Sequence, residues 1–188
     1  MATVPPSRTP ARTPFRTPSR RTLVGIAFIV GGALLALGAL LALAGGPVAD
    51  GVRWVSFVAD LAIAVGFGLL AWEVDGRPAR IAFIVAAAGW LLLAVGEIAG
   101  LPGELGTVAA IAAAGGGLVG AILMRPSGYF GPSGSLVFLI ATVIFAVQVF
   151  FEILGVDLQG VGLLLTLLFA AGLVITGVLL QQRARPVD

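Results

Sequence analysis

The chain has 188 residues, of which 59% are hydrophobic and only 11% are charged, and its formal net charge is +2. A soluble domain has roughly 25% charged residues because its surface faces water, so this composition excludes an ordinary soluble fold. Cysteine and histidine are both absent, which excludes disulfides and thiolate metal sites and removes the usual ligands of haem and zinc.

Residues 1–22 form an arginine- and proline-rich segment before the first apolar stretch. The triplet Arg-Thr-Pro occurs three times, beginning at Arg8, Arg12 and Arg16. Proline fixes φ and lacks the donor that a helix needs, so we expect a disordered cytoplasmic tail. One interpretation is a cationic arm on anionic lipid, with each arginine contributing about 1 kcal/mol near the surface. The simpler interpretation, which we favour, is a solvated tail that only directs insertion.

Six apolar stretches follow this tail, and each is long enough to cross a bilayer. A hydrocarbon core about 30 Å thick requires roughly 20 residues of helix. The stretches are continuous and show no alternation of polar and apolar residues, which favours helices over a β-barrel. The sequence therefore predicts an all-α integral membrane protein with six transmembrane helices within residues 23–181 and a short tail at 182–188. The six expected spans are residues 23–44, 52–72, 81–100, 105–124, 135–154 and 161–180.

The first stretch has features of an export signal. Residues 19–24 resemble a twin-arginine motif, and residues 42–44 resemble an A-x-A cleavage site. The apolar run of about 22 residues is longer than the 7–15 of a signal peptide. We therefore expect the first span to be retained, with its removal as the alternative.

Arginine is distributed very unevenly across the predicted membrane. Threading six spans places ten of the eleven arginines on one side and only Arg53 on the other. Basic residues concentrate in cytoplasmic segments, so both termini are predicted to be cytoplasmic. The acidic residues lean the other way, and the excess of arginine therefore does not indicate a nucleic-acid partner. Because the chain is rich in Ala and Gly and uses arginine without lysine, we expect a bacterial plasma (inner) membrane.

A shift of 55 residues brings several features of the chain into register. Residues 26–30 and 81–85 are the same pentapeptide, Ile-Ala-Phe-Ile-Val, and Phe138 continues the phenylalanine series. Gly45, Gly100 and Gly155 recur at the outer ends of the odd-numbered spans. The pattern predicts three helical hairpins of the same orientation, that is, a parallel internal repeat. The alternative is chance similarity within a chain rich in Ala, Gly, Leu and Val.

Two glycine pairs have the small-xxx-small spacing that allows helix backbones to approach closely in a membrane. They are Gly96 with Gly100 in the third span and Gly116 with Gly120 in the fourth. We expect both pairs at helix contacts, and the spacing leaves open whether these contacts lie within one chain or between two.

Four polar residues lie within the outer halves of the spans. Asp60 lies six residues beyond Trp54. Placing an ionised acid at the centre of a helix in the bilayer costs about 2.5–3.5 kcal/mol of insertion free energy. Glu97 and Glu152 are related by the 55-residue shift, and Gln148 precedes Glu152 by one helical turn. The four are predicted to converge on one outward-facing polar pocket. They either bind a cation or proton or, in the interpretation we favour, lock neighbouring helices through hydrogen bonds.

Catalytic machinery is not visible in the sequence. Without His, Cys or Lys there is no base-activated serine dyad, thiolate nucleophile or Schiff-base lysine. We therefore expect a protein that is not an enzyme and has no catalytic residue, metal site or cofactor. The leading hypothesis is a structural or accessory membrane component that contacts lipid and a membrane-protein partner or a second copy of itself. The alternative is a small carrier or channel for a cation or proton that uses Asp60, Glu97, Gln148 and Glu152.

Overall fold

The computed structural model describes residues 19–44, 49–156 and 160–184, which form six long helices and one short 3₁₀ turn. All six helices are long and apolar enough to cross a membrane, and the described ranges contain no strand. The prediction of an all-helical, multi-pass membrane protein is therefore confirmed, and the helix ends agree with the expected spans to within four residues. The elements are α1 (Arg20–Ala44), α2 (Ala49–Glu73), α3 (Arg77–Ala99), α4 (Gly103–Met124), η1 (Arg125–Ser127), α5 (Gly131–Ile153) and α6 (Val161–Ala184).

Local sequence signals explain where several helices begin and end. The side-chain oxygen of Ser19 accepts a hydrogen bond from the backbone N–H of Thr22 at 3.3 Å, which satisfies one of the free donors at the start of α1. Pro78 lies in the first turn of α3, where its missing N–H has no consequence. Gly100 and Gly155 follow α3 and α5 with φ of 67° and 68°, the left-handed conformation in which glycine commonly ends a helix. Gly45 lies outside the described residues.

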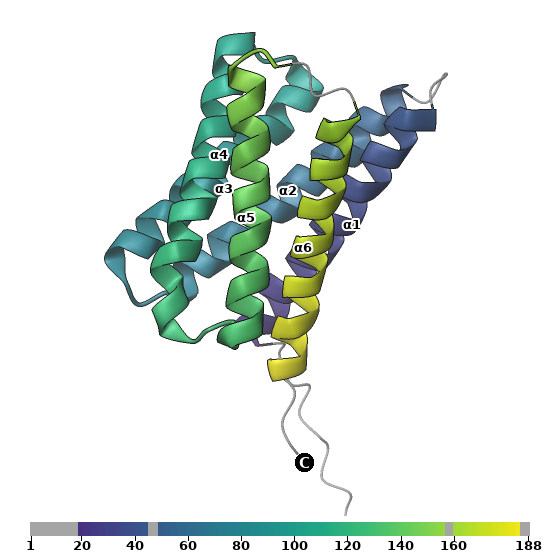
Figure 1. Cartoon of the computed structure of the whole chain (residues 1–188). Helices are drawn as coiled ribbons and strands as arrows, with labels where there is room; N and C mark the ends of the chain where they lie inside the picture. Colours follow the sequence, from purple (N-terminus) through teal and green to yellow (C-terminus); the bar gives the residue numbers. More distant parts are fainter. Residues whose placement is uncertain (1–18, 45–48, 157–159, 185–188) are drawn as a thin grey trace, which may run out of the picture.

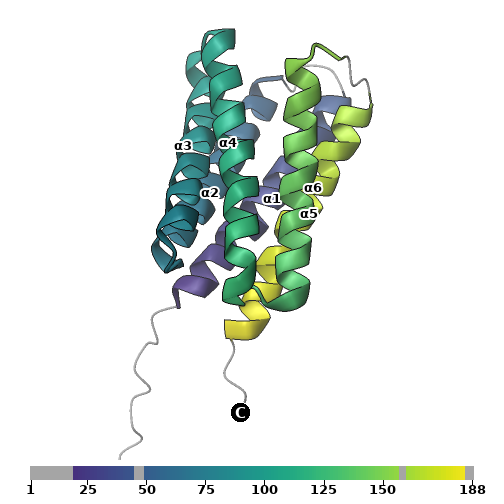
Figure 2. The same ribbon diagram turned by 60° about the vertical axis from the view of Figure 1, so that its left-hand side comes forward.

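The helices form a closed ring in chain order. Each helix packs against its neighbours in the sequence, and α6 returns to pack against α1. The start of α1 and the end of α6 therefore lie at the same end of the bundle (Figure 1). Figure 2 shows the same arrangement from the side, with the hairpins α3–α4 and α5–α6 flanking α1 and α2.

The two ends of the ring differ in charge. We call the end where α1 begins and α6 ends the basic end, and it carries Arg20, Arg21, Arg77, Arg80, Arg125 and Arg183. We call the opposite end the acidic end, and among the residues whose side chains are described it carries Arg53, Glu97, Glu104 and Glu152. The arginine-rich segment 1–18 lies outside the described residues.

Aromatic side chains fill the interior of the ring in two layers. The first layer consists of Phe28, Phe67, Phe83 and Phe138, whose ring centroids lie 5.4 to 6.3 Å apart. Because these residues come from α1, α2, α3 and α5, on different sides of the ring, their meeting point is its centre.

The second layer lies two helical turns closer to the acidic end. Trp90 of α3, Phe145 of α5 and Phe169 of α6 stack on one another with centroids 4.8 to 5.7 Å apart. Seven residues separate Phe83 from Trp90 and Phe138 from Phe145, and this spacing places the two layers about 10 Å apart along the helices. Stacked and edge-on aromatic pairs contribute about 0.5–1.5 kcal/mol each beyond the area they bury.

Glycine allows α1 and α6 to approach each other closely enough to close the ring. A Cβ atom on Gly177 would lie 2.5 Å from the carbonyl oxygen of Gly25, and one on Gly32 would lie 2.6 Å from that of Ala170. Both contacts involve backbone atoms, which cannot move aside without separating the helices. Seven residues separate the two contacts on each helix, so they form one seam between antiparallel helices.

The prediction for the glycine pairs is half correct. Gly116 and Gly120 both face α3, where a Cβ on Gly116 would lie 2.6 Å from backbone atoms of Ala82 and Ala86 and one on Gly120 would overlap the ring of Phe83. The prediction for Gly96 and Gly100 is wrong, because Gly100 terminates α3 and a Cβ there would meet nothing within 4 Å. The four-residue spacing of Gly96 and Gly100 therefore reflects the glycine that ends α3, and the pair does not mark a contact between helices.

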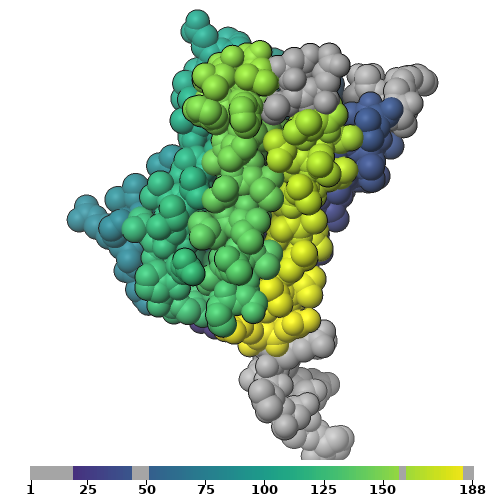
Figure 3. All heavy atoms as spheres, viewed as in Figure 1, coloured from purple at the N-terminus to yellow at the C-terminus, as the bar shows by residue number. Residues whose placement is uncertain are grey.

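Apolar side chains cover the outside of all six helices. Figure 3 shows the face formed by α4, α5 and α6. Leu136, Ile140 and Phe150 of α5 are among the large apolar side chains that are exposed. Trp54 and Trp72 are exposed at opposite ends of α2, where interfacial anchors are expected. In water such a surface would be strongly unfavourable, and lipid chains are its natural environment.

We predict that Gly177→Ala lowers the stability of the bundle by about 1–3 kcal/mol, because the new methyl group overlaps the backbone of α1. Gly115→Ala is the matched control, since a Cβ at Gly115 meets nothing within 4 Å and alanine favours helix by about 1 kcal/mol. Thermal unfolding in detergent measures both effects. Equal behaviour of the two variants would contradict the proposed seam.

Candidate functional site

The predicted polar residues lie on three helices, all in the half of the bundle nearer the acidic end. Asp60 belongs to α2, Glu97 to α3, and Gln148 and Glu152 to α5. The structure places them as two separate pairs.

The first pair, Asp60 and Glu97, lies along the contact between α2 and α3. Phe67 meets Phe83 near the middle of these antiparallel helices, and Arg53 meets Glu97 at their acidic end. Asp60 lies seven residues from both Arg53 and Phe67, so it is level with Trp90 of the second aromatic layer.

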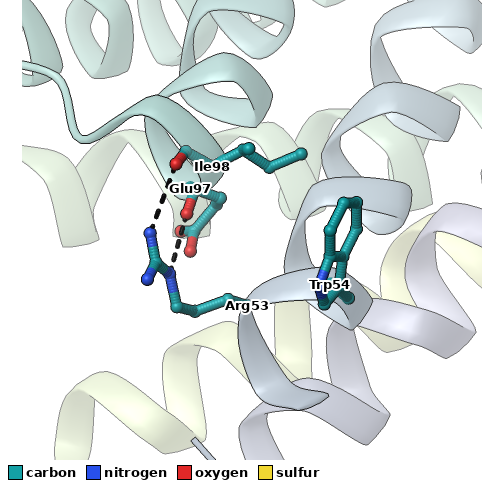
Figure 4. A pocket seen from close by; sticks show the side chains of 4 residues that line it. All are labelled: Arg53, Trp54, Glu97 and Ile98. Carbon is teal, nitrogen blue, oxygen red and sulfur yellow. Dashed lines mark hydrogen bonds between the residues drawn. The ribbon is translucent and has the colours of Figure 1, made fainter. Parts of the chain in front are cut away.

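Arg53 caps the end of α3. Its Nε–H donates a hydrogen bond to the backbone carbonyl of Glu97 at 2.9 Å, and its Nη2–H donates to that of Ile98 at 3.4 Å (Figure 4). The last carbonyls of a helix have no partner within the helix, and a guanidinium can satisfy them and complement the helix dipole. Arg53 thus binds the backbone of α3, and Ser56, the other polar residue of α2 close to Asp60 in the sequence, faces Gly38 of α1.

A cavity of about 240 Å³ lies beside this cap and is lined by Arg53, Trp54, Glu97 and Ile98. Figure 4 shows the guanidinium directed toward the end of α3 and the indole of Trp54 on the other side of the opening. The cavity combines a cation, a carboxylate and apolar walls at the level of the membrane interface.

Asp60 is buried, with 6% of its surface exposed. At the same level, the buried indole N–H of Trp90 has no hydrogen-bond partner among the described residues. A buried polar group without a partner costs about 1–3 kcal/mol. A buried carboxyl group and an unpartnered indole donor thus lie at one level of the bundle.

The second pair, Gln148 and Glu152, is joined directly. The side-chain amide of Gln148 donates to Glu152 Oε1 at 3.0 Å, and the hydroxyl of Thr166 donates to Gln148 Oε1 at 3.3 Å. These bonds connect α5 to α6. The role of Thr166 was missed in the sequence because only its place opposite Gln148, eighteen residues away, makes it a partner.

Glu97 and Glu152 line two different cavities. Glu152 lines one of about 300 Å³ between α4 and α5, together with Gly106 and Thr107. Glu97 lines the cavity beside Arg53, at the contact between α2 and α3. These two cavities have no lining residue in common, and the convergence of all four polar residues on one pocket stays a prediction.

The chemistry available at these residues is limited. Carboxylates and an amide can hold a proton or a monovalent cation, or can bond neighbouring helices together. Within the described ranges, no three acidic side chains gather in a way that would hold a metal ion.

We compared the chain with protein-family models, curated proteins and solved structures, and none of them matches it.

We predict that Arg53→Gln lowers the stability of the bundle by about 1 kcal/mol, because the terminal carbonyls of α3 lose their charged donor. Arg125→Gln serves as the control, since Arg125 is exposed at the opposite end. The midpoint of thermal unfolding in detergent compares the two. If Arg53 does not stabilise the end of α3, both variants will unfold at the same midpoint as the unmodified protein, and the prediction is wrong.

Proposed function

We propose that this multi-pass membrane protein is a structural or accessory component of its membrane and conducts neither ions nor protons. The observation that carries the proposal is the pair of aromatic layers at the centre of the ring. Ions and protons cross membranes along polar side chains or water. Here the interior between the two charged ends is occupied by the rings of the two aromatic layers.

The inventory of side chains supports a role outside catalysis. The chain has no His, Cys or Lys, so the common nucleophiles and their activating bases are missing. Of the acidic candidates, Glu97 lines the cavity beside Arg53 and Glu152 is bonded to the amide of Gln148, an arrangement that does not favour joint acid–base chemistry. We therefore propose a non-enzymatic protein whose partners are the lipid bilayer and either another membrane protein or a second copy of the chain.

We also propose that three related hairpins build the bundle. Phe28, Phe83 and Phe138, each 55 residues from the next, meet in the first aromatic layer. Three residues beyond each phenylalanine, Gly31, Ala86 and Ala141 lie at close contacts with the second helix of the same hairpin. Equivalent positions thus have equivalent packing roles, which supports duplication over chance similarity.

The orientation we propose has both termini in the cytoplasm of a bacterium, with the chain in its plasma membrane. The arginines gathered at the basic end support this orientation, since cytoplasmic segments are enriched in basic residues. We retain contact between the arginine-rich tail and anionic lipid as part of the proposal, although the tail lies outside the described residues.

The absence of native cysteine makes the orientation directly testable. We predict that Glu104→Cys, at the acidic end, reacts with a membrane-impermeant maleimide in intact cells. Ser133→Cys, exposed at the basic end, should react only after the membrane is opened. The reverse pattern would place the termini outside.

A second candidate function is a small carrier for a proton or cation. It is favoured by one observation, the burial of Asp60 level with the unpartnered indole of Trp90. A carrier needs a site of this kind near the middle of the bundle, and it also needs a conformational change that moves the aromatic layers apart.

A flux assay separates the two functions. We predict that purified protein in sealed liposomes moves neither protons nor monovalent cations above the level of empty liposomes, and that Asp60→Asn changes only thermal stability. Flux that disappears in Asp60→Asn but persists in Glu104→Gln, an exposed control, would establish the carrier and reject the structural proposal. For the accessory role, gentle solubilisation should recover the chain in an assembly of fixed stoichiometry.

A further inference from the structure

A second pocket opens at the basic end, far from the polar pairs. It has a volume of about 300 Å³ and lies between the start of α1, the α2–α3 turn and the segment that connects α4 to α5. Its charged and polar lining residues are Arg21, Glu73, Asp75, Ser127 and Tyr129.

Tyr129 is the unusual residue of this pocket. Only 7% of its surface is exposed, and its hydroxyl is buried without a hydrogen-bond partner among the described residues. Buried tyrosine hydroxyls normally have a partner, so this donor requires an explanation. Burial raises the pKa of Tyr129 to about 12, with the carboxylate of Glu73 adding to the shift and Arg21 opposing it. A tyrosine hydroxyl is protonated at physiological pH and can donate one hydrogen bond.

The charges around Tyr129 are separated into two groups. The guanidinium of Arg21 lies 4.7 Å from the centre of the Tyr129 ring, on the side contributed by α1. Glu73 is the last residue of α2 and forms an ion pair with Arg20 at 3.9 Å, and Asp75 lies in the turn that follows. The pocket thus combines cationic and hydroxyl donors with carboxylate acceptors.

The depth of the pocket matches the headgroup region of a bilayer. Its residues lie where the spans end, and the exposed indole of Trp72 lies next to Glu73 at the same level. Leu123 and Met124 add apolar side chains to the lining.

We propose that this pocket binds the headgroup of a zwitterionic phospholipid with a primary ammonium group. The phosphodiester accepts hydrogen bonds from Tyr129 and Arg21, and the ammonium donates to Glu73 and Asp75. A purely anionic headgroup fits less well, because it would meet the two carboxylates without a cation to offset them. The proposal is independent of whether the bundle conducts ions.

The first test measures lipid selectivity by thermal unfolding in detergent with added lipid. We expect stabilisation in the order phosphatidylethanolamine, then phosphatidylcholine, whose quaternary ammonium has no N–H to donate, then phosphatidylglycerol. Equal stabilisation by phosphatidylglycerol and phosphatidylethanolamine would overturn the proposal. Soluble phosphoethanolamine carries the same charged groups without acyl chains, and an equal effect at the same concentration would overturn the assignment to a lipid.

Tyr129→Phe removes only the hydroxyl and gives the sharpest contrast. We expect it to leave stability in lipid-free detergent unchanged or slightly increased, since an unpartnered buried donor is lost, and to weaken phosphatidylethanolamine binding about tenfold. A hydroxyl with a purely structural role would instead lower stability in both conditions. Arg21→Gln should also weaken binding, whereas the matched control Arg125→Gln should not, because Arg125 is outside the pocket lining.

A measurement on the unmodified chain avoids any doubt about folding of the variants. Tyr129 is the only tyrosine, so ¹³Cζ-tyrosine labelling gives a single NMR signal from the site. Titration with phosphatidylethanolamine should shift this signal as its hydroxyl gains an acceptor, and an unchanged signal at saturating lipid would reject the proposal.

Discussion

The bundle depends on the approach of α1 to α6. In lipid, burying one apolar side chain against another gives little net driving force, so helices associate mainly through close packing. At Gly25 and Gly177 each backbone occupies the space that a Cβ atom of the other would need. Since α1 is the first helix and α6 the last, this seam joins the two ends of the chain. The central aromatic core is enclosed on all sides only while the ring is closed.

In the closed ring, apolar and charged side chains lie at different levels along the bundle axis. The two aromatic layers occupy the centre, and charged groups remain at the ends, where water and headgroups solvate them. Asp60 is the exception, since it lies one layer below the acidic end beside apolar surfaces. An inert scaffold and a carrier would differ mainly in whether this carboxyl exchanges a proton or cation with the outside.

The two ends satisfy their polar groups differently. At the acidic end, Arg53 uses its donors on the terminal carbonyls of α3, and Gln148 bonds both Glu152 and Thr166. These contacts are complete within the chain and hold helices together. At the basic end, the Tyr129 hydroxyl has no acceptor in the described structure although a cation and two carboxylates surround it. The basic end is therefore better suited to binding a molecule from outside the bundle.

Much of the architecture follows from the sequence alone, because crossing a bilayer imposes simple requirements. Apolar length sets the six spans, glycine and proline set helix ends such as Gly100 and Pro78, and the arginine pattern predicts a common side for the termini. The face shared by Gln148 and Glu152 also follows, because residues four apart lie one above the other on a helix.

Only the tertiary structure decided which faces meet. Gly96 and Gly100 have the same spacing as Gly116 and Gly120, yet only the second pair lies at a helix contact. Likewise, Glu97 and Glu152 are equivalent in sequence but lie beside different helices, and Arg53 binds a backbone that is distant in the chain. The physical reason is that lipid accepts any apolar face of a helix. Helix rotation and partner choice therefore depend on the fit of specific small and aromatic side chains, which a linear pattern does not encode.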